Sequence, residues 1–105
     1  MKKKTFTIQL GNGDGTYKAW EWEYSKSFEL LGEVWVIHRP VAIMEAGVPI
    51  PNLKRWKVSH KETGAGVATD RFIVGAVEAA RTIIESKAAV LLDAIATARN
   101  KGEKK

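Results

Sequence analysis

The periodicity of the hydrophobic residues changes once along this chain, at about residue 70. Before that point, short runs alternate apolar and polar residues, as is typical of β-strands with one buried face. After it, apolar residues from Ile73 to Ile95 recur every three or four positions, as in an amphipathic helix. Strands followed by a helix, with no alternation of the two, predict an α+β fold in the order β-β-β-β-β-α. We expect an antiparallel sheet of about five strands with one long C-terminal helix packed across one face.

Turn residues and helix signals set the predicted boundaries. Asn-Gly and Asp-Gly pairs within 11–15 supply the positive φ angles of a hairpin turn, and Pro40 ends a strand because it cannot donate to a ladder. Thr69 or Asp70 can cap the helix, and Asn100 with Gly102 supplies its end. The strands are therefore predicted at residues 5–10, 17–24, 33–39, 54–61 and 67–69.

Length and composition indicate one soluble domain. A chain of 105 residues with 45% hydrophobic residues can build a single core, and it has no cysteine for disulfides or thiolate metal sites. The lysines at 2–4 are followed by an alternating segment rather than a continuous apolar run, so we expect no signal peptide, no membrane span and a cytoplasmic location. The domain is predicted to span 1–105, with short basic tails at 1–4 and 101–105.

The net charge of +5 resides in those tails. Residues 5–100 carry 11 Lys and Arg against 11 Asp and Glu, so the body of the domain is neutral. A domain built to neutralise phosphates usually carries its excess charge on the body, as a patch or stripe. The charge distribution therefore favours protein binding over nucleic-acid binding as the main role.

The predicted helix is longer than the sheet that should cover it. About 30 residues make a helix of roughly 45 Å, whereas strands of six residues span about 20 Å. Its far half, residues 88–98, nevertheless stays apolar over more than one face. Three alternatives for its cover remain open: the segment 41–53, a second copy of this chain, or a different protein.

The segment 41–53 (VAIMEAGVPIPNL) is apolar where a connection between strands is usually polar, and two prolines stiffen it. One interpretation places Ile43, Met44, Val48 and Ile50 in the core, folded back onto the helix. The other makes the segment an exposed docking loop, because apolar surface on a soluble chain tends to mark an interface.

Reaction chemistry is not apparent in the sequence. His38 and His60 are the only histidines, and neither has metal-ligand spacing. The serines lack the context of a nucleophile elbow, and the glycine run 11–15 lacks the GK[ST] ending of a phosphate loop. We therefore predict a protein that is not an enzyme and that holds no cofactor or metal.

Two features of the strands favour binding. Arg55, Lys57 and Lys61 alternate on one face of the strand 54–61, where they can meet phosphates or an acidic protein surface. Trp35 lies within Val-Trp-Val-Ile, a strand apolar on both faces, so one face must be covered by the chain or by a partner.

The run WKVSHKETG at residues 56–64, leading into a short strand and then a helix through Ala76 and Ala80, resembles a layout seen in small accessory proteins of phages and mobile elements. The resemblance covers residues 34–84 and carries over no functional residues. It implies a protein that modulates a host complex by binding, as anti-CRISPR and other counter-defence proteins do.

The sequence thus predicts a non-enzymatic binding module that acts by protein–protein contact, as an inhibitor of a host nucleoprotein complex. One alternative is a nucleic-acid binder that uses the strand 54–61 and the Lys-rich tails. Another is a small homodimeric structural protein that pairs through the C-terminal half of its helix. The candidate partner-binding residues are Trp35, Arg39, Ile43, Met44, Val48, Ile50, Arg55, Lys57, Lys61, Val90, Leu91 and Ile95.

Overall fold

The computed structural model describes residues 4–11 and 15–103, with the side chains described through Arg99. This part of the chain forms seven strands and two helices. In order they are β1 (Thr5–Gly11), β2 (Tyr17–Leu30), β3 (Glu33–His38), β4 (Val41–Glu45), β5 (Val48–Pro51), β6 (Trp56–His60), β7 (Gly66–Asp70), α1 (Ile73–Ser86) and α2 (Ala88–Glu103). The predicted turn at 12–14 and the tail residues 1–3 and 104–105 lie outside the described residues, and the predicted tail 101–103 continues α2.

The α+β class and the antiparallel sheet are confirmed. Five strands form one sheet in the order β1-β2-β3-β6-β7, and each pairs antiparallel with its neighbours. The expectation that residues 41–53 only connect two strands is wrong. They hold β4 and β5, which form a separate two-stranded sheet inserted between β3 and β6.

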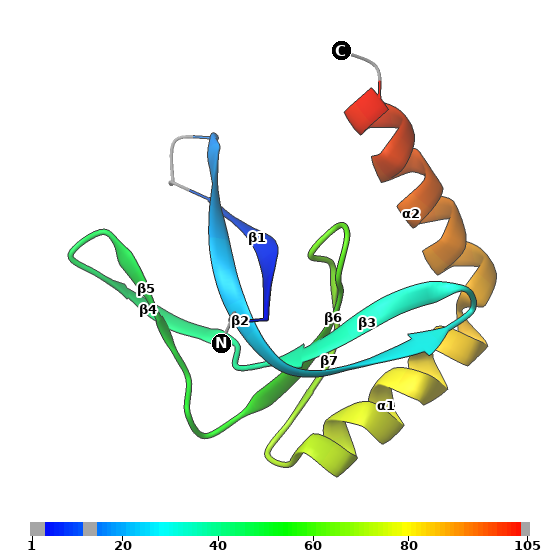
Figure 1. Ribbon diagram of the computed structural model, residues 1–105, viewed down its shortest axis with the longest axis horizontal. Coiled ribbons are helices and arrows are strands. Elements are labelled where there is room, and N and C mark those ends of the chain that lie inside the picture. Colours follow the sequence, from blue (N-terminus) through cyan, green and yellow to red (C-terminus); the bar gives the residue numbers. More distant parts are fainter. Residues whose placement is uncertain (1–3, 12–14, 104–105) are drawn as a thin grey trace.

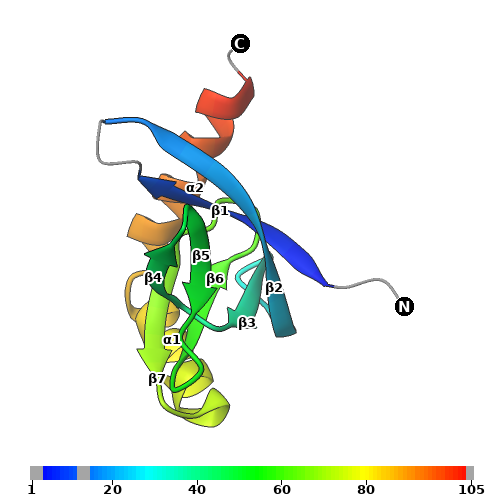
Figure 2. The ribbon, with the colours of Figure 1, turned by 90° about the vertical axis from the view of Figure 1, so that its left-hand side faces the viewer.

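Strand β2 is the long element that shapes the sheet. Its first half pairs with β1 and its second half with β3, and the register shifts between Tyr24 and Lys26. Such a bulge increases local twist and bends a strand. Figures 1 and 2 show the result: β2 curves along its length, and the β1–β2 pair crosses over the layer of β3, β6 and β7.

That curvature buries both faces of β3. On one face, Trp35 and Ile37 pack with Val58 of β6 and with Ala80 and Ile84 of α1. On the other face, Val36 packs with Phe6 and Ile8 of β1, and Trp20, Trp22 and Tyr24 of β2 surround them. The chain itself therefore covers both apolar faces of β3, which explains the two-sided hydrophobic run in the sequence.

The turn between β6 and β7 lies against the edge of β1. Gly64 has a φ of +76°, and a Cβ atom at this residue would lie 2.9 Å from the carbonyl oxygen of Thr7. Glycine provides both the left-handed backbone and the close approach. The contact covers part of the β1 edge, which would otherwise offer unpaired backbone groups.

The single long helix predicted from the sequence is wrong, because the helix breaks at Lys87. This residue has φ −118° and ψ 27°, and α1 and α2 leave it in different directions (Figure 1). α1 packs along β6 and β7, while α2 turns back past the end of the sheet. The start also differs from the prediction: Phe72 is the N-cap, and Asp70 Oδ2 accepts a hydrogen bond from the Phe72 N–H at 3.3 Å. The helix continues to Glu103, beyond the predicted end at Asn100.

Candidate functional site

The β4–β5 hairpin gathers several exposed apolar residues on one element. Ile43 is 59%, Met44 50% and Val48 50% exposed, and Leu53 just beyond the hairpin is 71% exposed. Ala46 and Gly47 both have positive φ, at 51° and 79°, which is the backbone of a tight two-residue hairpin turn. In Figure 1 the hairpin projects from the side of the molecule opposite the helices. The interpretation that it folds back onto the helix as core is therefore wrong.

A network around Arg39 holds the base of this hairpin. The Arg39 guanidinium stacks 3.6 Å from the centroid of the Trp56 ring, and its Nη1 donates to the carbonyl oxygens of Leu53 and Arg55 at 2.9 and 3.0 Å. The indole Nε1 of Trp22 donates to the Arg39 carbonyl at 2.7 Å. The chain entering β4 and the chain leaving β5 are thus fixed to each other and to β2. The hairpin thus projects as an exposed apolar element from a fixed base. We call this base, formed by Trp22, Arg39 and Trp56, the mount of the hairpin.

A groove of about 440 Å³ runs beside that mount. Trp22, Pro51 and Leu53 supply its apolar surface, while Glu21, Glu23 and Arg39 supply its charges. Within the hairpin, Pro49 is buried and Ile50 is half-buried, whereas Pro51 and Leu53 at the groove are exposed. A concave apolar surface with a few fixed polar groups is the usual form of a binding site.

The predicted basic surface of β6 is interrupted. Arg55 and Lys61 are exposed, but Ser59 between them is buried, and the Lys57 side chain crosses Gly66 of β7. The Lys61 ammonium lies 5.6 Å from the centroid of the Tyr24 ring. These three cations therefore do not form one continuous patch, and Arg55 groups with Lys54 and Arg39 at the base of the hairpin.

Three of the sequence candidates lie in the core rather than on a surface. Trp35 is 1% exposed and Ile95 5% exposed, and Leu91 packs half-buried against the same cluster. They can offer little or nothing to a partner in this conformation. Val90, in contrast, is 69% exposed. The far half of the predicted helix is thus covered in part by the chain's own sheet, an alternative that the assumption of a straight helix left out.

A cluster that the sequence did not reveal joins α2 to the sheet, and we call it the Arg99 clamp (Glu33, His60, Glu62, Arg99). Arg99 Nε donates to both Glu62 carboxylate oxygens at 2.9 Å, and its Nη2 donates to Glu62 Oε1 and Glu33 Oε1 at 2.6 Å. Glu33 Oε1 also accepts from His60 Nε2 at 2.7 Å. The residues lie up to 66 positions apart in the chain, so no local pattern could have identified them.

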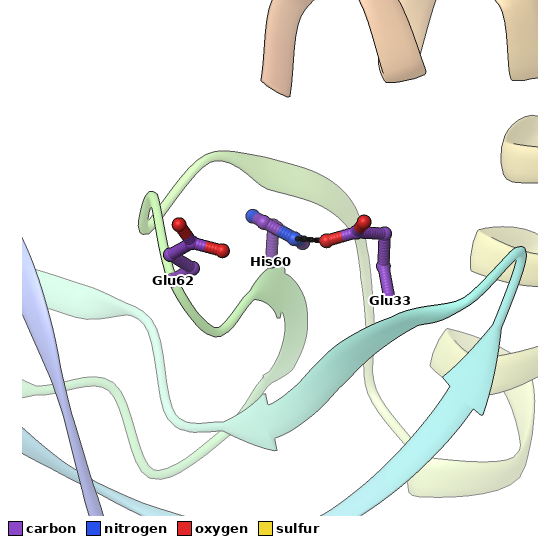
Figure 3. A group of neighbouring side chains, drawn as sticks. All are labelled: Glu33, His60 and Glu62. Atoms are coloured by element: carbon purple, nitrogen blue, oxygen red, sulfur yellow. Dashed lines mark hydrogen bonds and ion pairs between the residues drawn. The ribbon is translucent and has the colours of Figure 1, made fainter. Parts of the chain in front are cut away.

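The clamp contains three groups that can ligate a metal. One ligand atom each from Glu33, His60 and Glu62 lie within 4.8 Å of one another, and Figure 3 shows the His60 ring pointing a nitrogen at Glu33. His60 Nδ1 accepts from the Thr63 backbone N–H at 3.3 Å, so Nε2 carries the proton and donates it to Glu33. The Arg99 guanidinium hydrogen-bonds to both carboxylates, and its single positive charge balances one of their two negative charges.

Electrostatics in the clamp favours the ionised carboxylates. Burial acts to raise the pKa of Glu33, but hydrogen bonds from His60 and Arg99 outweigh it and lower the pKa below its ordinary value. The hydrogen bond from Arg99 likewise lowers the pKa of Glu62, and the two carboxylates raise the pKa of Arg99. Glu33, Glu62 and Arg99 are therefore charged at neutral pH.

His38 and Ser59 form a second polar pair, on the opposite face of the sheet from His60. His38 Nδ1 donates to the Arg39 carbonyl at 2.8 Å, and Nε2 accepts from Ser59 Oγ at 2.7 Å. Burial lowers the pKa of His38 to about 4, so the ring is neutral at pH 7. Ser59 is itself buried, so its hydroxyl is closed to a substrate. Both histidines are hydrogen-bonded residues of the interior.

Comparisons with protein-family models, with curated proteins and with solved structures give no match to this chain. Among the described residues, no helix has the length and apolar character needed to cross a membrane. The geometry of the chain itself must therefore support any functional proposal.

Proposed function

We propose that this chain is a protein-binding module without enzymatic activity, and that it binds its partner through the β4–β5 hairpin. The observation that carries the proposal is the combination of exposed Ile43, Met44 and Val48 with a mount held by Arg39. Exposed apolar residues gathered on one element tend to mark an interface. A preorganised element also binds with a smaller loss of conformational entropy than a mobile loop.

The charges of the hairpin favour a protein over a nucleic acid. Residues 41–53 include no Lys or Arg, and Glu45 adds a negative charge next to the Ala46–Gly47 turn. A nucleic acid would meet this carboxylate instead of the cations that phosphate binding requires. Lys54, Arg55 and Arg39 lie only at the base.

These features define the partner's chemistry. An apolar cleft can receive the Ile43–Met44 end of the hairpin, and carboxylates at the rim of that cleft can pair with Lys54 and Arg55. Apolar anchors at the centre with charges at the rim are the usual anatomy of a protein interface. That the partner is a host nucleoprotein complex is the finer part of the proposal, and the resemblance of residues 34–84 to phage accessory proteins is its only support.

The test compares three tagged proteins in captures from a bacterial lysate: the natural chain, the double variant Ile43→Asp/Met44→Asp, and the control Val90→Asp. The hairpin variant places charge on the proposed contact, whereas the control places it on α2, at a residue that is also well exposed. Each capture is repeated after nuclease treatment, and circular dichroism checks that all three proteins are folded.

The proposal requires a protein that is retained at constant stoichiometry by the natural chain and by Val90→Asp, survives nuclease, and is lost with the hairpin variant. Recovery that depends on intact nucleic acid would instead favour the nucleic-acid alternative. A partner that the hairpin variant still binds, or no partner in any lysate of a suitable host, would overturn the assignment of this surface.

A further inference from the structure

The helix break at Lys87 is not enforced by a proline or a glycine. Ser86-Lys87-Ala88 contains no Gly or Pro, and Lys and Ala are good helix formers. The Lys87 N–H donates to the Ile83 carbonyl at 2.9 Å, and the Leu91 N–H donates to the Lys87 carbonyl at 2.9 Å. Both bonds have helical i→i−4 spacing, so α-helical hydrogen bonding reaches Lys87 from both sides. Sharp kinks in helices normally coincide with a proline, a glycine or an inserted group. Here the local contribution is the Ser86 hydroxyl, which donates to the Ile83 carbonyl at 3.2 Å and so shares the acceptor of the Lys87 N–H.

The apolar stripe continues through the break without a change of phase. Val77, Ala80 and Ile84 on α1 are followed at helical spacing by Ala88, Leu91 and Ile95 on α2. A straight helix would keep all six on one face. Long-range contacts therefore bend the chain: Leu91 and Ile95 pack on the Trp35 cluster, and Arg99 closes its clamp on Glu33 and Glu62.

The surface of the sheet on which α2 packs, which we call the seat of α2, leaves unfilled space beneath the helix. A cavity of about 120 Å³ separates Leu91, Ala94, Ile95 and Ala98 from the turn and first residues of β7, and Trp35 forms its floor. Among the described side chains of α2, Arg99 is the one that hydrogen-bonds to the sheet. α2 is thus held on the sheet by few contacts. A second copy of the chain has the same seat and can make the same contacts with this helix.

We propose that two copies of this chain exchange α2. In the exchanged dimer the helix runs straight through Lys87, and the α2 of each copy lies on the seat of the other, with its Ile95 against the other copy's Trp35 cluster and its Arg99 in the other copy's clamp. Every contact of the closed monomer is then made again between chains, and the main conformational change is at one residue. Exchange of an identical element is a low-cost route to a dimer because it needs no new complementary surface.

The first test changes the backbone preference at Lys87. Lys87→Ala favours the straight helix and Lys87→Gly favours the break, and neither side chain takes part in the seat. Ala is preferred to Gly inside a helix by roughly fivefold per site, and a dimer contains two such sites. The dimer dissociation constant from sedimentation equilibrium is thus expected to be roughly 25-fold lower for Lys87→Ala than for Lys87→Gly. Equal constants, or monomers alone from both variants at the highest attainable concentration, would overturn the proposal.

The second test identifies which chain supplies α2. The natural sequence has no cysteine, so Ala65→Cys/Ala98→Cys places two thiols on opposite walls of the cavity. A short bismaleimide added to the dimer fraction is expected to link two chains, and added to the monomer fraction to link one chain to itself; a denaturing gel separates these products. Each single-cysteine variant controls for random collisions. Links within single chains only, from a genuine dimer, would show a dimer that retains its own α2 and would overturn the exchange.

This inference does not rest on the proposed hairpin function. The variant Ile43→Asp/Met44→Asp leaves Lys87, the seat and the clamp unchanged, so its dimer dissociation constant is expected to equal that of the natural chain. Failure of exchange would leave the hairpin assignment standing, and failure of the hairpin assignment would leave exchange standing.

Discussion

The β4–β5 hairpin and α2 both carry many apolar residues, yet only α2 packs part of them, Leu91 and Ile95, on the Trp35 cluster. α2 follows a single residue that bends, Lys87, and it returns to place Ile95 on the core. The hairpin has no such freedom, because Arg39 ties both of its ends together and Pro49 is anchored. The comparison teaches that an apolar segment is buried by its own chain when a hinge lets it return, and stays exposed when its mount is rigid.

The largest expected effect comes from placing the same charge in both regions. Ile95→Asp puts a carboxylate in the core and removes a packed side chain, so we expect it to lower the free energy of unfolding by about 3–5 kcal/mol. Ile43→Asp, at an exposed residue, is expected to change it by less than about 0.5 kcal/mol. Urea unfolding followed by tryptophan fluorescence measures both.

An exposed residue of α2 provides a control for the comparison of Ile95→Asp with Ile43→Asp. Val90→Asp lies on the same helix as Ile95 but faces solvent, and it should resemble Ile43→Asp rather than Ile95→Asp. Similar losses from all three variants would mean that the hairpin is packed as firmly as α2, and the contrast between the two regions would fail.

His38 gives the hairpin side of the molecule its own pH dependence. It precedes β4 by three residues, and burial lowers its pKa from 6.5 to about 4. Because the unfolded chain then binds a proton that the folded chain does not, the stabilisation is complete above pH 6.5 and is lost as pH falls toward 4. The free energy of unfolding should decrease by up to about 3 kcal/mol across this window.

The variant His38→Gln isolates that contribution. Its unfolding free energy, measured by urea titration at a series of pH values, should be nearly flat across the same window, whatever its absolute value. An unchanged slope in the variant would assign the pH dependence to groups other than His38.

Two glycines with nearly the same backbone φ, one in the hairpin and one in the β6–β7 turn, differ in the space available for a side chain. Gly47 in the hairpin has φ +79° and open space at the Cβ position, whereas Gly64 has φ +76° and faces the Thr7 carbonyl oxygen at 2.9 Å. Gly47→Ala is expected to cost about 1 kcal/mol for the left-handed backbone alone. Gly64→Ala adds the clash with β1, so its cost should reach about 2–3 kcal/mol.

Thermal unfolding of the two alanine variants checks this difference. The variant Gly64→Ala should also loosen β1, which amide hydrogen exchange at Phe6 and Ile8 would report. If both alanine variants lost the same stability, the turn would not be pressed against β1, and the closure of the sheet would be weaker than the geometry indicates.

Local periodicity in the sequence was enough to predict the antiparallel sheet, the strands near 5–10, 33–39 and 54–61, and a helix after Asp70, although its N-cap is Phe72. It could not predict the break at Lys87, because the helix propensities there favour a continuous helix, and the bend accompanies the contacts of α2 with Trp35 and Glu33 and the Ser86 hydroxyl bond to the Ile83 carbonyl. The hairpin was missed as structure for a related reason. Its two prolines argue against a strand in a central sheet, but they are tolerated in a separate two-stranded one.

The candidate site divides in the same way. Exposed Ile43, Met44 and Val48 could be proposed from sequence because their exposure follows from the rigidity of their own segment. Trp35 and Ile95 were misplaced as partner contacts, since each is covered by an element that the straight-helix assumption put elsewhere. The Arg99 clamp assembles residues from β3, the β6–β7 turn and α2, so it depended on the tertiary fold from the outset.

The smallest expected effect is the loss of stability at acid pH that comes from the Arg99 clamp. This clamp holds α2, whereas His38 lies beside the hairpin, so the two regions are expected to differ in the pH at which they lose stability. Arg99 lowers the pKa of Glu62 and contributes to the lowered pKa of Glu33, from ordinary values of 4.5. Their stabilisation is therefore present above pH 4.5 and is lost as pH falls further, a range that overlaps the His38 window only at its acid end, between about pH 4 and 4.5. In Arg99→Gln this acid loss should be shallower, and high salt should reduce it in the natural chain because the guanidinium is partly exposed. Arg81→Gln, which removes an exposed cation from α1, should keep the natural slope. If Arg81→Gln flattened the acid limb as much as Arg99→Gln, the effect would reflect net charge, and α2 would be held by Leu91 and Ile95 alone.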